Sequence, residues 1–173
     1  MRKVRLLAAG LPLVVVAITA LVVVPNWGGE TPDANLAAAQ PNLQTALQAA
    51  ETYYAAHGNS FLGLMNPETP TTLSSIQQID NYLSYVSGGP STGPHVISTY
   101  VGDGGAYVVL TAFANGIEAC WGILDLPRRA GVVDIAQSPG IYYFVSRSPS
   151  PAACNAARIT SVTAYSTSGF PPA

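Results

Sequence analysis

Residues 42–58 read NLQTALQAAETYYAAHG, and this stretch decides the fold of the chain. Its larger apolar residues are spaced by four, three and four positions, which places them on one face of an α-helix. The opposite face is polar, and the Gly-Asn pair that follows is typical of a helix end. Such a helix needs a partner surface, so we expect it to pack on a sheet formed by the second half of the chain. The predicted packing face consists of Leu43, Leu47, Ala50 and Tyr54.

An apolar segment precedes this helix. Residues 6–24, LLAAGLPLVVVAITALVVV, contain no charge, and as a helix they would extend about 28 Å, close to the thickness of the bilayer core. We interpret them as a retained transmembrane anchor rather than a cleaved signal, because signals usually have a shorter apolar region and a small-residue exit. The cations before the segment predict an N-terminus inside the cell. We expect a single-pass cell-membrane protein with a basic cytoplasmic N-terminus at 1–5, the anchor at 6–24, a hinge at 25–32 and an extracytoplasmic head domain at 33–173.

Composition limits the partners of the head. The chain has 173 residues, enough for one core and an appendage, and only 9% of them are charged. Beyond residue 5, four arginines face nine acids, so this part carries a net charge of −5. Without a basic patch to neutralise phosphates, nucleic-acid binding is not expected. The membrane, contacted through residues 6–24, is the expected partner.

The remaining pattern predicts an α+β domain. We expect Pro41 to kink the first helix or to precede a fresh helix start near Asn42, and a second helix to cover residues 73–86. Residues 95–126 and 141–147 are rich in β-branched and aromatic residues, and turn signals interrupt them at strand-length intervals, including Asn115-Gly116. The expected sheet is antiparallel, with strands at 95–101, 106–113, 117–126 and 141–147.

The chain has two cysteines, Cys120 and Cys154. An even count in an exported domain favours a disulfide between them over a metal site. The alternative is two separate buried thiols.

No residue pattern indicates catalysis. His57 and His95 lie at an expected helix end and strand start, without the spacing of a zinc site, so a surface or capping role is the better interpretation. No G-x-S-x-G motif or Ser, His and Asp constellation is present. We therefore expect a protein that is not an enzyme. Its nine tyrosines are compatible with an adhesive face.

Several short motifs resemble type IV pilin-like proteins, and more narrowly the major pseudopilin of type II secretion. They are LVVVPN at 21–26, the amphipathic helix reaching Tyr53-Tyr54, CWGILD at 120–125 and GIYY at 140–143. The resemblance implies a structural subunit of a type IV pilus or a type II secretion-like assembly, with itself or other pilin-like subunits as partners. At the expected processing site, Lys3, Val4 and Ala8 replace the family's Gly, aromatic residue and Glu.

The resemblance has two further implications. Pseudopilins often hold calcium in a loop of the sheet region, which makes Asp103, Asp125 and Asp134 weak ligand candidates; solvated loop or turn aspartates remain the better interpretation, because the sequence lacks the dense acids of a dedicated calcium loop. No other cofactor is expected. The alternative function, favoured by the altered processing site, is a monomeric cell-surface binding or adhesion module that carries a pilin-like head on an ordinary signal anchor.

Overall fold

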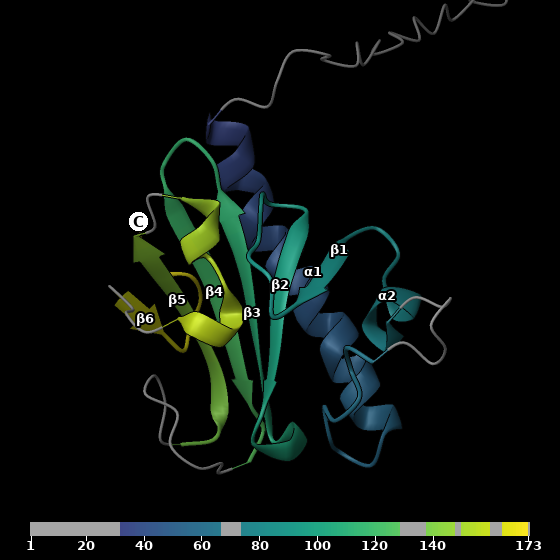
Figure 1. Cartoon of the computed structure of the whole chain (residues 1–173). Coiled ribbons are helices and arrows are strands. Elements are labelled where there is room, and N and C mark those ends of the chain that lie inside the picture. Colours follow the sequence, from purple (N-terminus) through teal and green to yellow (C-terminus); the bar gives the residue numbers. More distant parts are fainter. Residues whose placement is uncertain (1–31, 67–73, 129–137, 148–149, 160–163, 173) are drawn as a thin grey trace, which may run out of the picture.

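The computed structural model describes residues 32–66, 74–128, 138–147, 150–159 and 164–172. One long helix lies against a twisted sheet, which makes the domain α+β (Figure 1). The predicted anchor at 6–24 and all but the last residue of the hinge lie outside the described residues. Among the residues that are described, no helix is both long enough and apolar enough to cross a bilayer.

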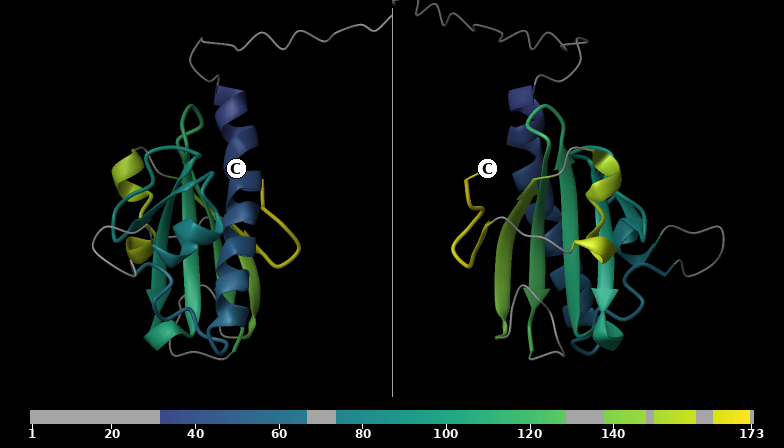
Figure 2. Two further views of the ribbon diagram at one scale, coloured as in Figure 1. Left: turned by 90° about the vertical axis from the view of Figure 1, so that its right-hand side faces the viewer. Right: turned by 60° about the vertical axis from the view of Figure 1, so that its left-hand side comes forward.

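The long helix, α1, runs from Pro32 to Ala56 without a break. The fresh helix start expected near Asn42 is therefore wrong, because the helix already begins at Pro32 and continues through Pro41. Pro41 has no N–H to donate to the carbonyl of Ala37, but both residues are exposed, so water can satisfy that carbonyl. The N-terminal end of α1 lies at the end of the molecule that carries the turn at 115–118 (Figure 2).

Among the described residues the sheet has six strands in the order β1-β2-β3-β4-β5-β6, two more than expected. All neighbours pair antiparallel except β1 and β2, which are parallel, so the sheet is mixed rather than purely antiparallel. The predicted strands correspond to β2 to β5, and β3 and β4 are joined by a four-residue turn at 115–118 instead of the expected two-residue one. The strands are β1 (Ser84–Ser87), β2 (Val96–Gly102), β3 (Tyr107–Ala114), β4 (Ala119–Leu126), β5 (Gly140–Arg147) and β6 (Ala164–Ser166).

The second predicted helix is largely wrong. Within residues 74–86 the helical part is only α2, Ser75–Ile79, and Asp80 ends it in an extended conformation. The Asp80 carboxylate accepts hydrogen bonds from the Tyr82 N–H and the Tyr85 hydroxyl, which favours a turn over another helical turn. The chain then enters β1. The Gln77 side chain accepts from the Tyr85 N–H and donates to the Leu83 carbonyl, so one amide group pairs with the outer edge of β1.

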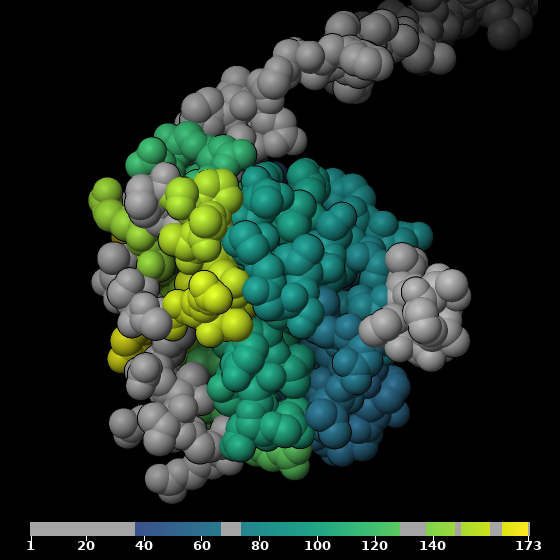
Figure 3. Space-filling view, viewed as in Figure 1, coloured from purple at the N-terminus to yellow at the C-terminus, as the bar shows by residue number. Residues whose placement is uncertain are grey.

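Both faces of the sheet are covered. On one face, α1 packs mainly on β3 and β4, where Leu43 and Leu47 meet Leu110, Trp121 and Ile123 in the main core. On the other face lies the segment 151–158, which contains the 3₁₀ helices η2 (Pro151–Ala153) and η3 (Ala156–Arg158) (Figure 3). Every residue of β4 is consequently buried. The sequence predicted only the helical cover and an irregular tail.

The C-terminal residues complete the main core beside α1 (Figure 2). The ring of Phe170 makes edge contacts with Trp121 and Tyr143, and Pro171 is buried. These residues cover the part of β4 and β5 that α1 does not reach. Gly122 serves the opposite face, because a Cβ at this position would collide with the Phe144 ring that crosses it.

The burial of one face of α1 leads to a first prediction, on stability. Leu43 is fully buried in the main core, so Leu43→Ala should lower the free energy of unfolding by about 3 kcal/mol through lost apolar contact and a cavity. Urea denaturation of the protein measures this change. Gln48→Ala, on the exposed face of the same helix, is the control and should change stability by less than about 0.5 kcal/mol. Equal effects of the two substitutions would contradict the described packing.

Candidate functional site

The predicted packing face of α1 is mostly buried. Leu43, Leu47 and Ala50 lie in the core, whereas Tyr54 is half-buried and packs on Phe61. Tyr53 takes the buried position instead: its hydroxyl donates to the Leu62 carbonyl and its ring stacks on His57. The helical spacing alone does not show which of the two tyrosines is buried. The hydrogen bond to a loop nine residues away decides which ring turns inward.

The outward face of α1 carries mostly small side chains and almost no charge. Thr45 and Thr52 donate their hydroxyls to the carbonyls of Pro41 and Gln48, so these groups are satisfied within the helix. Glu51 is the only acid or base among the exposed residues that the structure describes on this helix, which are Ala37, Pro41, Thr45, Gln48, Glu51, Thr52, Ala55 and Ala56. A surface of this kind can approach another helix closely and with little charge repulsion.

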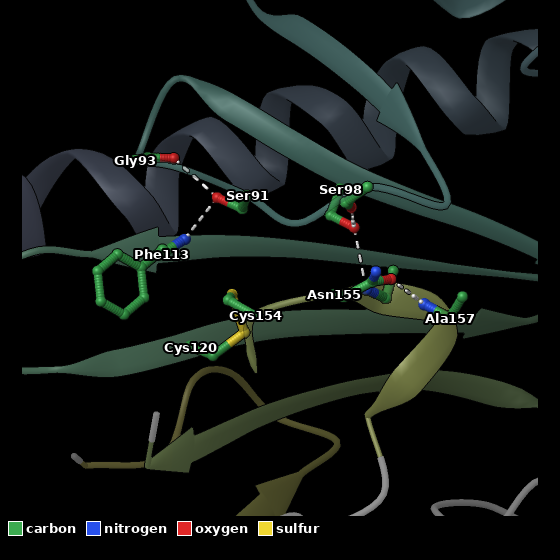
Figure 4. Close-up of a disulfide and its surroundings, with 10 residues drawn as sticks. Ser91, Gly93, Ser98, Phe113, Cys120, Cys154, Asn155 and Ala157 are labelled. Carbon is green, nitrogen blue, oxygen red and sulfur yellow. Dashed lines mark hydrogen bonds between the residues drawn. A yellow bond between two sulfur atoms is a disulfide. The ribbon is translucent and has the colours of Figure 1, made fainter. Parts of the chain in front are cut away.

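The predicted disulfide between Cys120 and Cys154 is confirmed. It joins β4 to the middle of the segment 151–158, directly after Ala153, on the sheet face opposite α1 (Figure 4). Phe113 packs on the bridge, and both sulfurs are buried. The bridge therefore fixes the cover of the second face to the central strand.

A buried polar cluster surrounds the disulfide. The Ser91 hydroxyl accepts from the Phe113 N–H and donates to Gly93, and the Ser98 hydroxyl accepts from the Ala156 N–H (Figure 4). Asn155 donates its side-chain amide to the Gly88 carbonyl. These bonds tie the connection between β1 and β2 to the disulfide-linked segment. They satisfy polar groups that burial would otherwise penalise, so we assign the cluster a structural role.

The aspartates named as weak calcium candidates do not form a described calcium site. Asp103 lies in the turn η1 (Asp103–Gly105) after β2, Asp125 lies on β4 on the face toward α1, and Asp134 lies outside the described residues. No group of three acid, histidine or cysteine ligands occurs among the residues that the structure describes. Burial, and secondarily the Glu51 carboxylate, raises the pKa of Asp125 from its ordinary value near 4 to about 6.

The histidines have structural contacts. The Nδ1 atom of His57 lies 2.8 Å from the Tyr53 carbonyl, at the C-terminal end of α1. The side chain of Asn42, buried in the first half of the packed helix, donates to the Pro94 carbonyl and lies 3.2 Å from Nδ1 of His95. Asn42 thereby joins α1 to the start of β2. No local pattern predicts this contact, because asparagine is a polar residue and this side chain lies in the core.

A groove of about 420 Å³ lies at the end of the molecule opposite the turn at 115–118. One wall is the loop at 62–66 that follows α1, and the other is formed by Tyr100, Val101 and the η1 turn. Sequence reasoning missed it, because its walls come from segments almost forty residues apart.

Comparison with known proteins does not assign the chain to a class. No family model, no curated protein and no solved structure matches it. Within its described residues the chain is a disulfide-bonded α+β domain in which one long helix lies on a mixed sheet.

The disulfide makes a second prediction. Replacing both cysteines by alanine should lower the free energy of unfolding by roughly 4 kcal/mol, because the bridge closes a 34-residue separation that is otherwise free in the unfolded chain. Urea denaturation measures the loss. A reducing agent should destabilise the unmodified protein by a similar amount and leave the double variant unchanged. Insensitivity of the unmodified protein to reduction would contradict the prediction.

Asp125 makes a third prediction, on pH dependence. Because its pKa is raised in the folded state, folding favours the protonated carboxyl; its contribution to stability is full below about pH 4 and is lost as the pH rises through about 6. Asp125→Asn should therefore stabilise the domain by about 1 kcal/mol at pH 7 and by almost nothing at pH 4. Thermal melts across this range measure the difference. Glu118→Gln, an exposed acid, is the control, and the same profile for both variants would refute the assignment.

Proposed function

We propose that the chain is a membrane-anchored, extracytoplasmic structural protein of the pilin or pseudopilin kind, a subunit of a type IV pilus or type II secretion-like assembly. In this proposal residues 6–24 hold it in the cell membrane and the disulfide-bonded domain stands outside. Its partners are copies of itself or other pilin-like subunits. It needs no cofactor and catalyses no reaction.

The observation that carries the proposal is the two-sided character of α1. Its inward face is buried along Leu43, Leu47 and Ala50, and its outward face is small and nearly uncharged. Seven residues, 25–31, connect the helix to the apolar segment. In this proposal α1 lies next to the membrane and is packed on its own sheet. The small side chains on its outward face would allow a neighbouring subunit to pack closely beside it.

The disulfide supports the extracytoplasmic location. Disulfides persist in oxidising compartments and are rare in the cytosol. The bridge between Cys120 and Cys154 is buried between the sheet and its cover, where it stabilises the fold. A location outside the membrane agrees with the cations that precede residue 6.

A second candidate function is a monomeric binding or adhesion module on an ordinary signal anchor. The observation that favours it lies in the sequence, where Lys3, Val4 and Ala8 depart from the family's processing motif. The family's Glu neutralises the N-terminal amine of a neighbouring subunit, and Ala8 cannot do so. The two candidates therefore differ in processing and in self-association.

Photo-crosslinking tests the assembly directly, and it is the fourth prediction. A photo-crosslinking amino acid placed at Gln48, on the outward face of α1, should give a ladder of oligomers when membranes carrying the full chain are irradiated. The same group at Tyr165, exposed on β6, is the control and should give a much weaker ladder. Both positions are exposed, so neither replacement should disturb the fold.

The mass of the membrane form completes this test. Loss of about three or ten N-terminal residues would indicate processing by a prepilin-type peptidase. An unprocessed chain that gives only monomers from both crosslinking positions would contradict the assembly role and favour the binding module. A chain found wholly in the soluble fraction would contradict the anchor.

A further inference from the structure

The edge of β2 is covered by β1 along only part of its length. β1 pairs with β2 in parallel from Ser84 opposite Val96 to Ser87 opposite Thr99, and β2 then continues to Gly102 (Figure 1). The Ser84 N–H donates to the His95 carbonyl. Because main-chain groups alternate along a strand, the N–H and C=O groups of the odd-numbered residues of β2 point toward β1. The main-chain N–H and C=O of Val101 therefore point to the same edge, beyond the last residue of β1.

Gly88 is the reason that the ladder stops there. The next bond of a regular ladder would join the Val101 N–H to the Gly88 carbonyl. Gly88 instead adopts a φ of 69° and turns the chain away, and its carbonyl accepts from the side chain of Asn155 at 3.0 Å. Within the described part of the chain, no backbone hydrogen bond reaches Val101 from this edge. The Val101 N–H and C=O are thus left without a strand partner at this edge.

The open edge lies inside the groove at the end of β1. Val101 and Ser87 line it on the sheet side, and Leu62, Leu64 and Met65 line the opposite wall. Tyr100, about two-fifths exposed, lies on the sheet side as well. None of the ten lining residues carries a charge at neutral pH, and Leu62, Leu64, Met65 and Val101 among them are apolar. The groove therefore favours an uncharged occupant with a main chain and small apolar side chains.

The walls of the groove are held in place before any ligand arrives. The Phe61 N–H donates to the Gly105 carbonyl at 2.9 Å, and the Tyr53 hydroxyl donates to the Leu62 carbonyl. Gly105 has a φ of 93°, and a Cβ there would collide with Ser60 and Leu62. Only glycine lets the loop at 62–66 lie so close to the η1 turn. A site whose walls are fixed in advance loses less freedom on binding.

We propose that this groove binds a short, uncharged, extended peptide segment of another protein, which adds to the sheet beside β2 in line with β1. The Val101 N–H and C=O would pair with the main chain of the segment, as in other cases of strand addition. Its alternate side chains would contact Leu62 and Met65 on one side and Tyr100 on the other. The site is independent of the proposed assembly through α1, so either can fail without the other.

Hydrogen exchange of the full chain gives the first test. The Val101 amide should exchange at least about tenfold faster than the Leu110 amide, which lies inside the ladder between β3 and β4. If both amides exchange equally slowly in the free protein, the edge is closed and the proposal fails. This measurement needs no ligand.

A peptide titration gives the second test. The probe is the acetylated and amidated pentapeptide Ser-Val-Thr-Val-Ser, which is added to the isotopically labelled full chain and followed by amide chemical shifts. It should move the signals of Val101, Leu62 and Gly105 and slow exchange at Val101. A version that is N-methylated at both valines should bind at least about tenfold more weakly, because it lacks the main-chain donors.

Two charge variants separate the groove from the rest of the surface. Leu62→Asp places a carboxylate in the groove wall and should weaken peptide binding about tenfold. Tyr165→Asp is the matched control on the opposite edge of the sheet and should leave binding unchanged; the two side chains are 65% and 61% exposed, so neither change should affect folding. Equal effects of the two variants would overturn the proposal. Signals that move with protein concentration but not with peptide would assign the groove to a second copy and would also overturn it.

Discussion

The covalent link between Cys120 and Cys154 is the constraint on which the second half of the fold depends. The segment at 151–158 has only short 3₁₀ turns of its own and buries few large side chains. Yet it covers the face of the sheet on which Leu124 and Phe144 lie. Because the disulfide holds this segment on β4, the burial of that face no longer depends on its weak intrinsic structure.

The buried hydrogen bonds around the bridge extend this constraint to the other end of the sheet. Ser98 and Asn155 connect the disulfide-linked segment to β2 and to the end of β1. The connection between β1 and β2 is unusually short for parallel strands, which commonly need a dozen residues or more. Two of its backbone groups bond to the segment: the Gly88 carbonyl accepts from Asn155, and the Ser91 N–H donates to the Cys154 carbonyl. One polar cluster thus stabilises two irregular segments together.

The sequence was informative wherever a local periodicity controlled the outcome. The spacing of Leu43, Leu47 and Ala50 predicted a helix with one packed face, and the turn signals located the strands that became β2 to β5. Non-local contacts decided the rest. β1 forms because Asp80 ends α2 and β2 offers an edge, and neither fact is visible in the helical spacing of residues 73–86. The groove beside Val101 depends on where Gly88 turns the chain away from the sheet, which no local pattern predicts.

The amide of Gln77 has a consequence for how the molecule behaves among its neighbours. By pairing with the Tyr85 N–H and the Leu83 carbonyl, one side chain occupies the positions that a foreign strand would use along β1. Exposed strand edges are common starting points for aggregation, and proteins frequently block them. The Gln77 side chain therefore protects the edge of β1 from pairing with a strand of another molecule. The fold needs no additional strand of its own to cover this edge.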